Sequence, residues 1–386
     1  MSSGNDLSPW WKISVILVLT IGFSILIWIA VRAYSDAPPI PEKVLSVKGE
    51  TVFTGADILA GQEVFLKYGL MENGSIWGHG AYLGPDFSAE YLHTLTLDAG
   101  RQIAHKNFQR GLTELSPVER ETVDAQVRRL LKENRYSPEA RTLFYTPEEI
   151  ESFNNQIEKW TDYFSTPSLN GGLLLGHIKN SAELRQLTTF FAWAAWASVS
   201  NRPGKSYSYT NNFPYDPAAG NVPGSSTILW SALSLITLLG GIAAVLFAFG
   251  KFNYLGWKGK DKHVRSLTPP GASTETQRAT MKFFLVVSLM FLAQVLVGGA
   301  TAHYRADPSS FFGIDLTAFF PGNIFRTWHL QLAIFWIATA YVAGGLFLAS
   351  LLGGKELKGQ VQGINLLFWA LIMVVFGSLL GEMLGV

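Results

Sequence analysis

The 386-residue chain contains no cysteine. This absence excludes disulfide bridges, thiolate metal sites, iron–sulfur clusters and a covalently attached c-type haem, which needs a Cys-x-x-Cys-His run. Charged residues are also scarce, because they make up 15% of the chain against roughly 25% in an ordinary soluble domain. The formal net charge of +1 gives no reason to expect a nucleic-acid partner.

The apolar residues are concentrated in five windows, each long enough to cross a bilayer, since a transmembrane helix needs roughly 20 apolar residues. We therefore predict a mainly α-helical, polytopic membrane protein with about five transmembrane helices and a mixed extramembrane domain. The first window is predicted to be a retained anchor, because its apolar run is too long for a signal peptide and no small-residue cleavage motif follows. The windows are Trp11–Tyr34, Thr227–Phe249, Met281–Ala302, Thr327–Leu352 and Ile364–Val386.

Basic residues predict the orientation of these windows. The segment from Lys251 to Lys282, which connects the second window to the start of the third, carries seven Lys and Arg residues against two acidic ones, and such loops stay on the cytoplasmic side. Lys355 and Lys358 place the loop between the last two windows on the same side. We therefore expect residues 35–225 and 303–326 on the periplasmic or outer face, and a multi-pass location in the cell inner membrane.

Composition divides the chain into three parts. We expect residues 1–34 to form the anchor, residues 35–225 the extramembrane domain, and residues 226–386 the remaining transmembrane helices. The last window ends at Val386 without a polar tail. This ending predicts that the chain is the front part of a longer protein.

Helix-start patterns recur within the extramembrane domain. Ser116 is followed by a proline and then by Glu119, and Thr146 repeats the same arrangement; both are typical of capped helix N-termini. A further helix is expected at Ser88–Thr94. Residues 188–200 are apolar and helical but too short to span a bilayer, so we expect them either on the membrane surface or inside the domain.

His329 lies a few residues inside the outer end of the fourth window. An imidazole in lipid is costly unless it has a partner. One interpretation is a hydrogen bond to a neighbouring helix; the other is axial ligation of haem iron, for which neutral imidazole is the usual donor. Arg326 lies one helical turn nearer the surface on the same face, and an arginine there is well suited to pair with a haem propionate.

A second group of residues stands at the outer end of the third window. His303 is followed by Asp307 and Phe311. A histidine, a carboxylate and an aromatic ring at the lipid boundary could bind a quinol and take up its protons. The alternative is an ordinary interface loop without a ligand.

The run WGHGAYLGPDF, residues 77–87, is rich in glycine. Glycines allow close backbone approach, and loop carbonyls are ligands that a hard cation accepts. His79 and His93 near this run are more typical of structural histidines than of metal ligands. The extramembrane domain has no nucleophile motif and no phosphate-binding glycine loop, so nothing in it indicates hydrolysis or nucleotide binding.

Four stretches together resemble the N-terminal half of the quinol-dependent, single-chain nitric oxide reductases of the haem–copper oxidase superfamily. They occur in the order of that family and run from residue 60 to about residue 340. The stretches are AGQEVFLKYGLMENGSIWGHGAYLGPDFSAEYLH, FFAWAAWASVSNRPGKSYSYTNNFPYDP, TAHYRADPSSFFGID and RTWHLQLAIFWIATA.

This resemblance implies a cytochrome-c-like extramembrane domain that has lost its haem c, with electrons supplied instead by membrane quinol, menaquinol or ubiquinol. His329 matches the ligand of a low-spin haem b, and Arg326 the residue beside its propionates. The family often has glutamate where this chain has Asp307, so that match is weaker. His303, Asp307 and Phe311 match the quinol pocket, and Gly80 and Tyr82 match a segment near a structural calcium.

The family reaction converts two NO, two electrons and two protons into N2O and water. The ligands of the active-site haem and of the non-haem iron lie in later helices of the family, outside this chain. The resemblance therefore implies a missing C-terminal half or a second subunit, and it leaves a homodimer open. Two alternatives are a non-catalytic membrane sensor or assembly protein derived from this family, and an oxygen-reducing relative.

Overall fold

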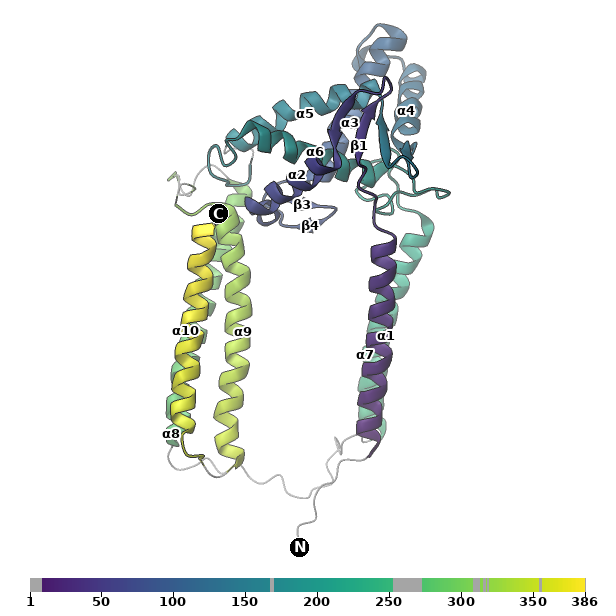
Figure 1. Cartoon of the computed structure of the whole chain (residues 1–386). Coiled ribbons are helices and arrows are strands. Elements are labelled where there is room, and N and C mark those ends of the chain that lie inside the picture. The colour runs from purple at the N-terminus through teal and green to yellow at the C-terminus, as the bar shows by residue number, and fades with distance from the viewer. Residues whose placement is uncertain are drawn as a thin grey trace.

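In the residues that it describes, the computed structural model of the protein has five long helices with a mixed α/β domain at one end (Figure 1). This arrangement confirms the predicted fold class, a mainly helical polytopic membrane protein with an extramembrane domain. The residues that the structure describes are 9–166, 170–252, 273–307, 313–314, 317, 319–353 and 356–385.

The secondary structure follows the chain as α-helices, short 3₁₀ helices (η) and short strands. Its elements are α1 Pro9–Ser35, β1 Lys43–Ser46, β2 Thr51–Thr54, α2 Gly55–Lys67, η1 Leu70–Glu72, β3 Ser75–Ile76, β4 His79–Gly80, α3 Phe87–Phe108, η2 Leu112–Glu114, α4 Pro117–Lys132, β5 Tyr136–Ser137, β6 Thr142–Tyr145, α5 Pro147–Ser165, α6 Ser181–Val199, α7 Ser225–Phe252, α8 Glu275–Ala306, α9 Gly322–Gly353 and α10 Gln360–Gly385.

The helices α1, α7, α8, α9 and α10 are long and apolar enough to cross a membrane, and each covers one predicted window, except that Val386 at the end of the last window lies outside the described residues. They extend beyond those windows, because polar residues continue the helices past the hydrocarbon. The clearest case is α8, where Thr274 and Gln277 form a capping box before the apolar run, a start that hydropathy cannot detect. The extramembrane domain follows α1, precedes α7, and stands at the same end as the junction of α8 and α9, as the predicted topology requires (Figure 1).

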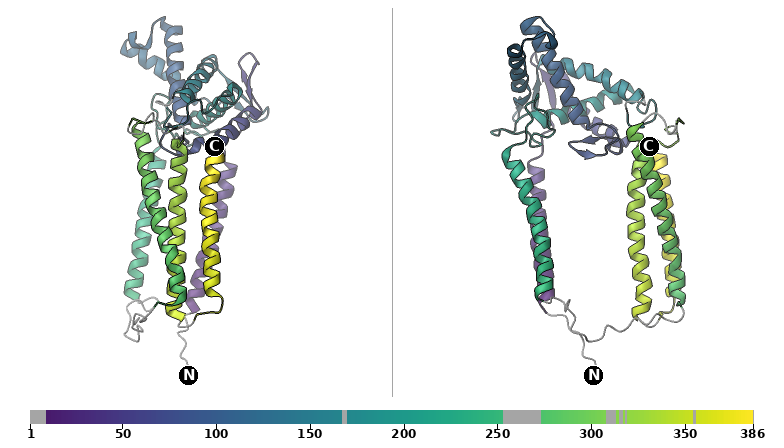
Figure 2. Two further views of the ribbon diagram at one scale, coloured as in Figure 1. Left: turned by 90° about the vertical axis from the view of Figure 1, so that its left-hand side faces the viewer. Right: turned by 180° about the vertical axis from the view of Figure 1, so that it is seen from behind.

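The three C-terminal helices form a bundle, whereas α1 and α7 descend from the opposite side of the domain (Figures 1 and 2). Two apolar clusters hold α8, α9 and α10 together, one centred on Phe283 and one on Leu332. The apolar side chains of α1 and α7 are almost all exposed. Such surfaces are stable only in lipid, where every backbone polar group is already satisfied within the helix.

The extramembrane domain contains a four-stranded sheet in the order β2-β1-β6-β5. Strand β1 pairs parallel with β6, although about one hundred residues separate them in the chain, and the other pairs are antiparallel. Helices α2, α3, α5 and α6 share one core with this sheet. Aromatic rings fill the centre of that core: Phe87 stacks on Phe191 with centroids 4.8 Å apart, and Trp160 meets Phe191 at 5.0 Å.

The local predictions in this domain have mixed outcomes. Capping boxes at Ser116 and Thr146 start α4 and α5 and are confirmed. The helix expected at Ser88–Thr94 is present but longer than predicted, since α3 continues to Phe108. Asp98 interrupts the apolar pattern of this helix although it is buried, and its carboxylate accepts a hydrogen bond from the Ser152 hydroxyl. The apolar segment 188–200 belongs almost entirely to α6, which is buried in the domain core. Of the two expected placements, the segment therefore lies inside the domain and not on the membrane surface.

Lys132, at the end of α4, fixes the loop that leads to α7. Its ammonium donates hydrogen bonds to the side-chain oxygens of Asn212 (2.8 Å) and Asn221 (2.6 Å). The side chain is half-buried, and this burial lowers the pKa of Lys132 from 10.5 to about 8. The loop is thus held by hydrogen bonds from the ammonium group of Lys132, although burial disfavours the charged form of this side chain.

This lowered pKa predicts that stability rises with pH between about 8 and 10.5. In that window the unfolded chain binds a proton that the folded chain has released, so alkaline pH favours folding. We expect Lys132→Met to reduce this rise by about 1–2 kcal/mol, a value discounted for the partial exposure of the group. Chemical unfolding followed across this pH range, with exposed Lys48→Met as control, measures it; a K132M profile parallel to the wild type would contradict the prediction.

Candidate functional site

His329 lies in α9 and faces α8. Its ring Nδ1 is 3.0 Å from the backbone carbonyl oxygen of Gln294. A carbonyl can only accept, so Nδ1 carries the proton, and in the neutral ring Nε2 keeps its lone pair. The ring therefore has the tautomer that a metal ligand bound through Nε2 requires.

The ring of His329 occupies a hollow above Gly298 of α8. A Cβ at position 298 would lie 2.6 Å from both Cε1 and Nδ1 of the ring, which is closer than any real contact. The two predicted interpretations of His329, a hydrogen bond to a neighbouring helix and axial ligation of haem iron, are compatible. The hydrogen bond uses Nδ1 and leaves the lone pair of Nε2 available to a metal. The donor chemistry and the hollow fit an axial ligand of haem iron.

Arg326 lies one turn nearer the extramembrane domain than His329. Its guanidinium forms an ion pair with Glu72 of η1, and both side chains are about one quarter exposed. This partner was not predicted from the sequence, because Glu72 is distant in the chain. A guanidinium has five N–H donors, so Arg326 could hold a second carboxylate such as a haem propionate beside Glu72.

Glu382 of α10 is a further polar residue at this end of the bundle. Its side chain lies near Thr327 of α9 and near Glu72 of the extramembrane domain. The sequence analysis gave it no role, although a carboxylate in an otherwise apolar window is a signal in itself.

His303 and Asp307 stand together in the last turn of α8. Asp307 caps the helix, and its backbone N–H donates to the His303 carbonyl oxygen at 2.8 Å. Five residues separate His303 from Gly298, which corresponds to about 7.5 Å along the helix axis. Phe311, the third predicted quinol residue, lies outside the described residues.

Gly80 is the last residue of a tight hairpin formed by β3 and β4, and Tyr82 follows two residues later. Gly80 has a φ of +146°, and a Cβ there would lie 2.2 Å from the carbonyl oxygen of Gly74, so only glycine fits. Tyr82 is 77% exposed. The structure therefore places both residues at an accessible turn of the extramembrane domain, as a backbone-carbonyl cation site would need.

Asp86 holds this hairpin in place. One carboxylate oxygen accepts from the Ser75 hydroxyl (2.9 Å) and the Gly78 N–H (2.7 Å), and the other accepts from Ser88 and from the Ala89 N–H. The same carboxylate caps the start of α3. Asp86 thus couples the hairpin to the longest helix of the domain.

The other histidines have structural surroundings. His93 pairs with Asp216 at 3.3 Å, and His79 is exposed. His177 contacts the Tyr68 carbonyl through Nε2 at 3.0 Å, and burial lowers the pKa of its ring. His263 lies outside the described residues. Among the residues that the structure does describe, no cluster of three or more His, Cys, Asp or Glu side chains could hold a metal ion.

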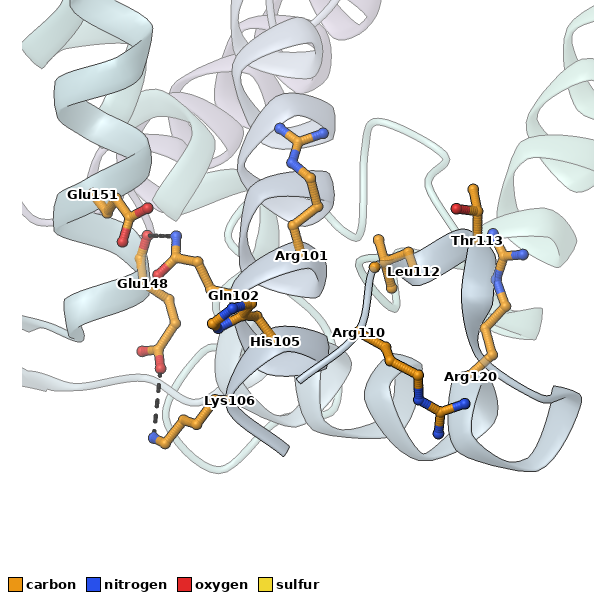
Figure 3. Close-up of a pocket in the computed structure, with 11 residues that line it drawn as sticks. Arg101, Gln102, His105, Lys106, Arg110, Leu112, Thr113, Arg120, Glu148 and Glu151 are labelled. Carbon is orange, nitrogen blue, oxygen red and sulfur yellow. Dashed lines mark hydrogen bonds and ion pairs between the residues drawn. The ribbon is translucent and has the colours of Figure 1, made fainter. Parts of the chain in front are cut away.

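A cleft of about 880 Å³ opens between α3, η2, α4 and α5 (Figure 3). Basic side chains line it, but carboxylates pair with several of them: Asp98 with Arg101, and Glu148 with Lys106 at 3.9 Å. The charged ends point in different directions around His105 rather than toward one point (Figure 3). This cleft is therefore a solvated surface feature, not a second site of chemistry.

Two family models match the chain. The model for the NorB cytochrome c-like domain of nitric oxide reductase matches residues 41–215. The model for cytochrome c and quinol oxidase polypeptide I matches residues 278–386. The chain is a NorB-like member of the haem–copper oxidase family. No curated protein matches it.

Membership of the haem–copper oxidase family makes the chain part of an oxidoreductase that carries haem. The cytochrome c-like match falls on the extramembrane domain, and the oxidase match falls on α8, α9 and α10, where His329 lies. The cytochrome c-like domain holds no covalent haem, since the chain has no cysteine.

The contacts of Asp86 predict the effect of removing it. Asp86→Ala deletes four accepted hydrogen bonds, two of them from backbone N–H groups, at a cost of about 2–4 kcal/mol. Amide hydrogen exchange at residues 75–82 should become faster. Asp57→Ala, which removes the N3 carboxylate from the capping box of a different helix, α2, should leave that segment unchanged; equal exchange in D86A and wild type would contradict the role of Asp86.

Proposed function

We propose that this chain provides the quinol-oxidising part of a quinol-dependent nitric oxide reductase, with one ligand of its low-spin haem b. The two family matches support this, because they join a cytochrome c-like domain to an oxidase-type membrane bundle in one chain. The missing cysteines also support it: without a covalent haem in the outer domain, electrons must enter by another route, and the family resemblance implies that membrane quinol supplies them.

The observation that carries the proposal is the imidazole of His329 inside the bundle. Its Nδ1 proton is committed to the Gln294 carbonyl, which leaves Nε2 as a donor to iron. A bound haem b would supply one-electron redox chemistry at this point. Arg326 would hold a propionate at the membrane surface while keeping its ion pair with Glu72.

Quinol, either menaquinol or ubiquinol, would bind at the outer end of α8. His303 and Asp307 would accept its hydroxyl protons there as it is oxidised to the quinone, and Phe311 would stack on its ring. The close spacing of His303 and Gly298 along α8 supports a donor site near the proposed haem ligand. A short distance between the quinol site and the haem would favour rapid electron transfer from quinol to haem.

The remaining parts of the proposal concern metals and location. Gly80 and Tyr82 would contribute to a structural calcium site, and the ligands of the non-haem iron would come from outside this chain. Residues 35–225 would face the periplasm and residues 226–386 would span the inner membrane, after an N-terminal anchor of residues 1–34. A second subunit or further residues of the same protein would complete the centre that joins two NO into N2O, and a homodimer is compatible with this assembly.

Oxygen reduction is the second candidate activity. The match of α8, α9 and α10 to an oxidase polypeptide favours it, since the two activities share these helices. Measuring N2O formation and oxygen consumption by the same purified enzyme, with quinol as donor, separates the two. Quinol-driven N2O formation supports the first proposal, and oxygen consumption without N2O supports the second.

Substitution of the haem ligand gives a direct test. His329→Ala should abolish the absorption of the low-spin haem, because no other donor replaces Nε2. His105→Ala, on the exterior cleft, is the control and should leave the spectrum as in the wild type. An H329A enzyme with an unchanged low-spin spectrum would show that the ligand lies elsewhere.

The quinol site predicts a loss that depends on the electron donor. His303→Ala should lower quinol-driven turnover by about 100-fold, in the range for removal of a general base. Turnover with an artificial reductant that delivers electrons directly should fall much less. Equal losses with both donors would mean that His303 serves the structure of the bundle rather than quinol oxidation.

A further inference from the structure

Gly298 and Gly299 are adjacent glycines in the interior of α8, where each costs about 1 kcal/mol of helix stability relative to alanine. Their surroundings differ. In the part of the chain that the structure describes, a Cβ at position 299 would meet nothing within 4 Å, whereas one at position 298 would strike the His329 ring. Packing against the His329 ring therefore explains why position 298 is a glycine, and this explanation does not apply to Gly299.

Gln294 connects α8 to two side chains of α9, the His329 ring and Trp336. The backbone oxygen of Gln294 accepts from Nδ1 of His329, and its side-chain oxygen accepts from Nε1 of Trp336 at 3.1 Å. Trp336 in turn packs edge-on against Phe291 of α8, with ring centroids 5.4 Å apart. These contacts link α8 and α9 within two turns of the imidazole, and turning the ring would break its own hydrogen bond to Gln294.

We propose that Gly298 and Gln294 are positioning residues for the axial imidazole: together they form a seat on α8 that sets the direction of Nε2 of His329. The inference rests on the proposed role of His329 as a haem ligand. The seat acts through two parts, the carbonyl of Gln294, which fixes the tautomer, and the absent side chain of Gly298, which fixes the ring plane.

A methyl group at position 298 would displace the ring rather than the backbone. The atoms within 3 Å of that methyl group are Cε1 and Nδ1, at the movable end of the His329 side chain. Moving the ring away breaks the 3.0 Å hydrogen bond to Gln294 and redirects Nε2. The residue thus controls the ligand geometry without touching the iron.

The test compares Gly298→Ala with Gly299→Ala in the haem-loaded enzyme purified from membranes. The two variants add the same methyl group to neighbouring positions of one helix, so they gain the same helix propensity. We expect G298A to retain about tenfold less low-spin haem per protein, a loss typical of disturbing a group that orients a metal ligand. G299A should retain the wild-type haem content, low-temperature EPR signature and midpoint potential.

His329→Ala distinguishes failure of the proposed haem ligand, His329, from failure of the proposed seat on α8. If H329A keeps the low-spin haem, the proposed ligand itself is wrong. If H329A loses that haem while G298A and G299A both match the wild type in EPR signature and potential, the ligand stands and the seat is overturned. Loss in H329A and G298A but not in G299A supports the seat.

A double variant covers the case in which G298A yields little folded protein. In H329A/G298A the ring is absent, so the methyl group has room. Recovery of the folded yield to that of H329A alone, measured by size-exclusion chromatography, would identify the ring as the cause and support the seat. A double variant that still fails to fold would overturn it, because the methyl group would then collide with something other than His329.

Discussion

The junction at the outer ends of α8 and α9 fixes the extramembrane domain relative to the membrane bundle. Arg326 pairs with Glu72 of the domain, and the backbone N–H of Gly322 donates to the carbonyl oxygen of Gly172 at 2.8 Å. Gly172, with a φ of +83°, lies against the ring of Tyr304, where a Cβ would approach within 3.0 Å. The rest of the site depends on this junction, because His329 follows Arg326 by one turn and His303 immediately precedes Tyr304.

The extramembrane domain keeps its fold by filling its own interior. Its family relationship is to a cytochrome c-like domain, yet the chain has no cysteine to hold a haem covalently. Phe87, Trp160 and Phe191 form a stacked and edge-to-face cluster at its centre, and each such ring buries a large apolar area. The domain therefore needs no prosthetic group to fill its core.

The sequence predicts this protein well where one residue or one window carries the information. Hydropathy finds all five long helices, and a histidine inside an apolar window is conspicuous by itself. It predicts poorly where the partner is distant in the chain: the parallel pairing of β1 with β6, the ion pair of Arg326 with Glu72, and the seat of His329 on Gly298 all join separate segments. A glycine has no side chain to signal a contact, so only the packed helices reveal what Gly298 accommodates.

Charge balance at the junction gives the proposed calcium site a physical reason. Glu382 lies near Glu72, and Arg326 is the cation that pairs with Glu72. A haem whose propionates reached Arg326 would add two more negative charges at the edge of the hydrocarbon, where unpaired charge is costly. One guanidinium cannot balance four carboxylates, whereas a divalent cation bound by oxygen atoms can restore neutrality. The accessible hairpin of Gly80 and Tyr82 belongs to the domain that Glu72 ties to this end, so the chain itself could bring such oxygen ligands to the excess charge.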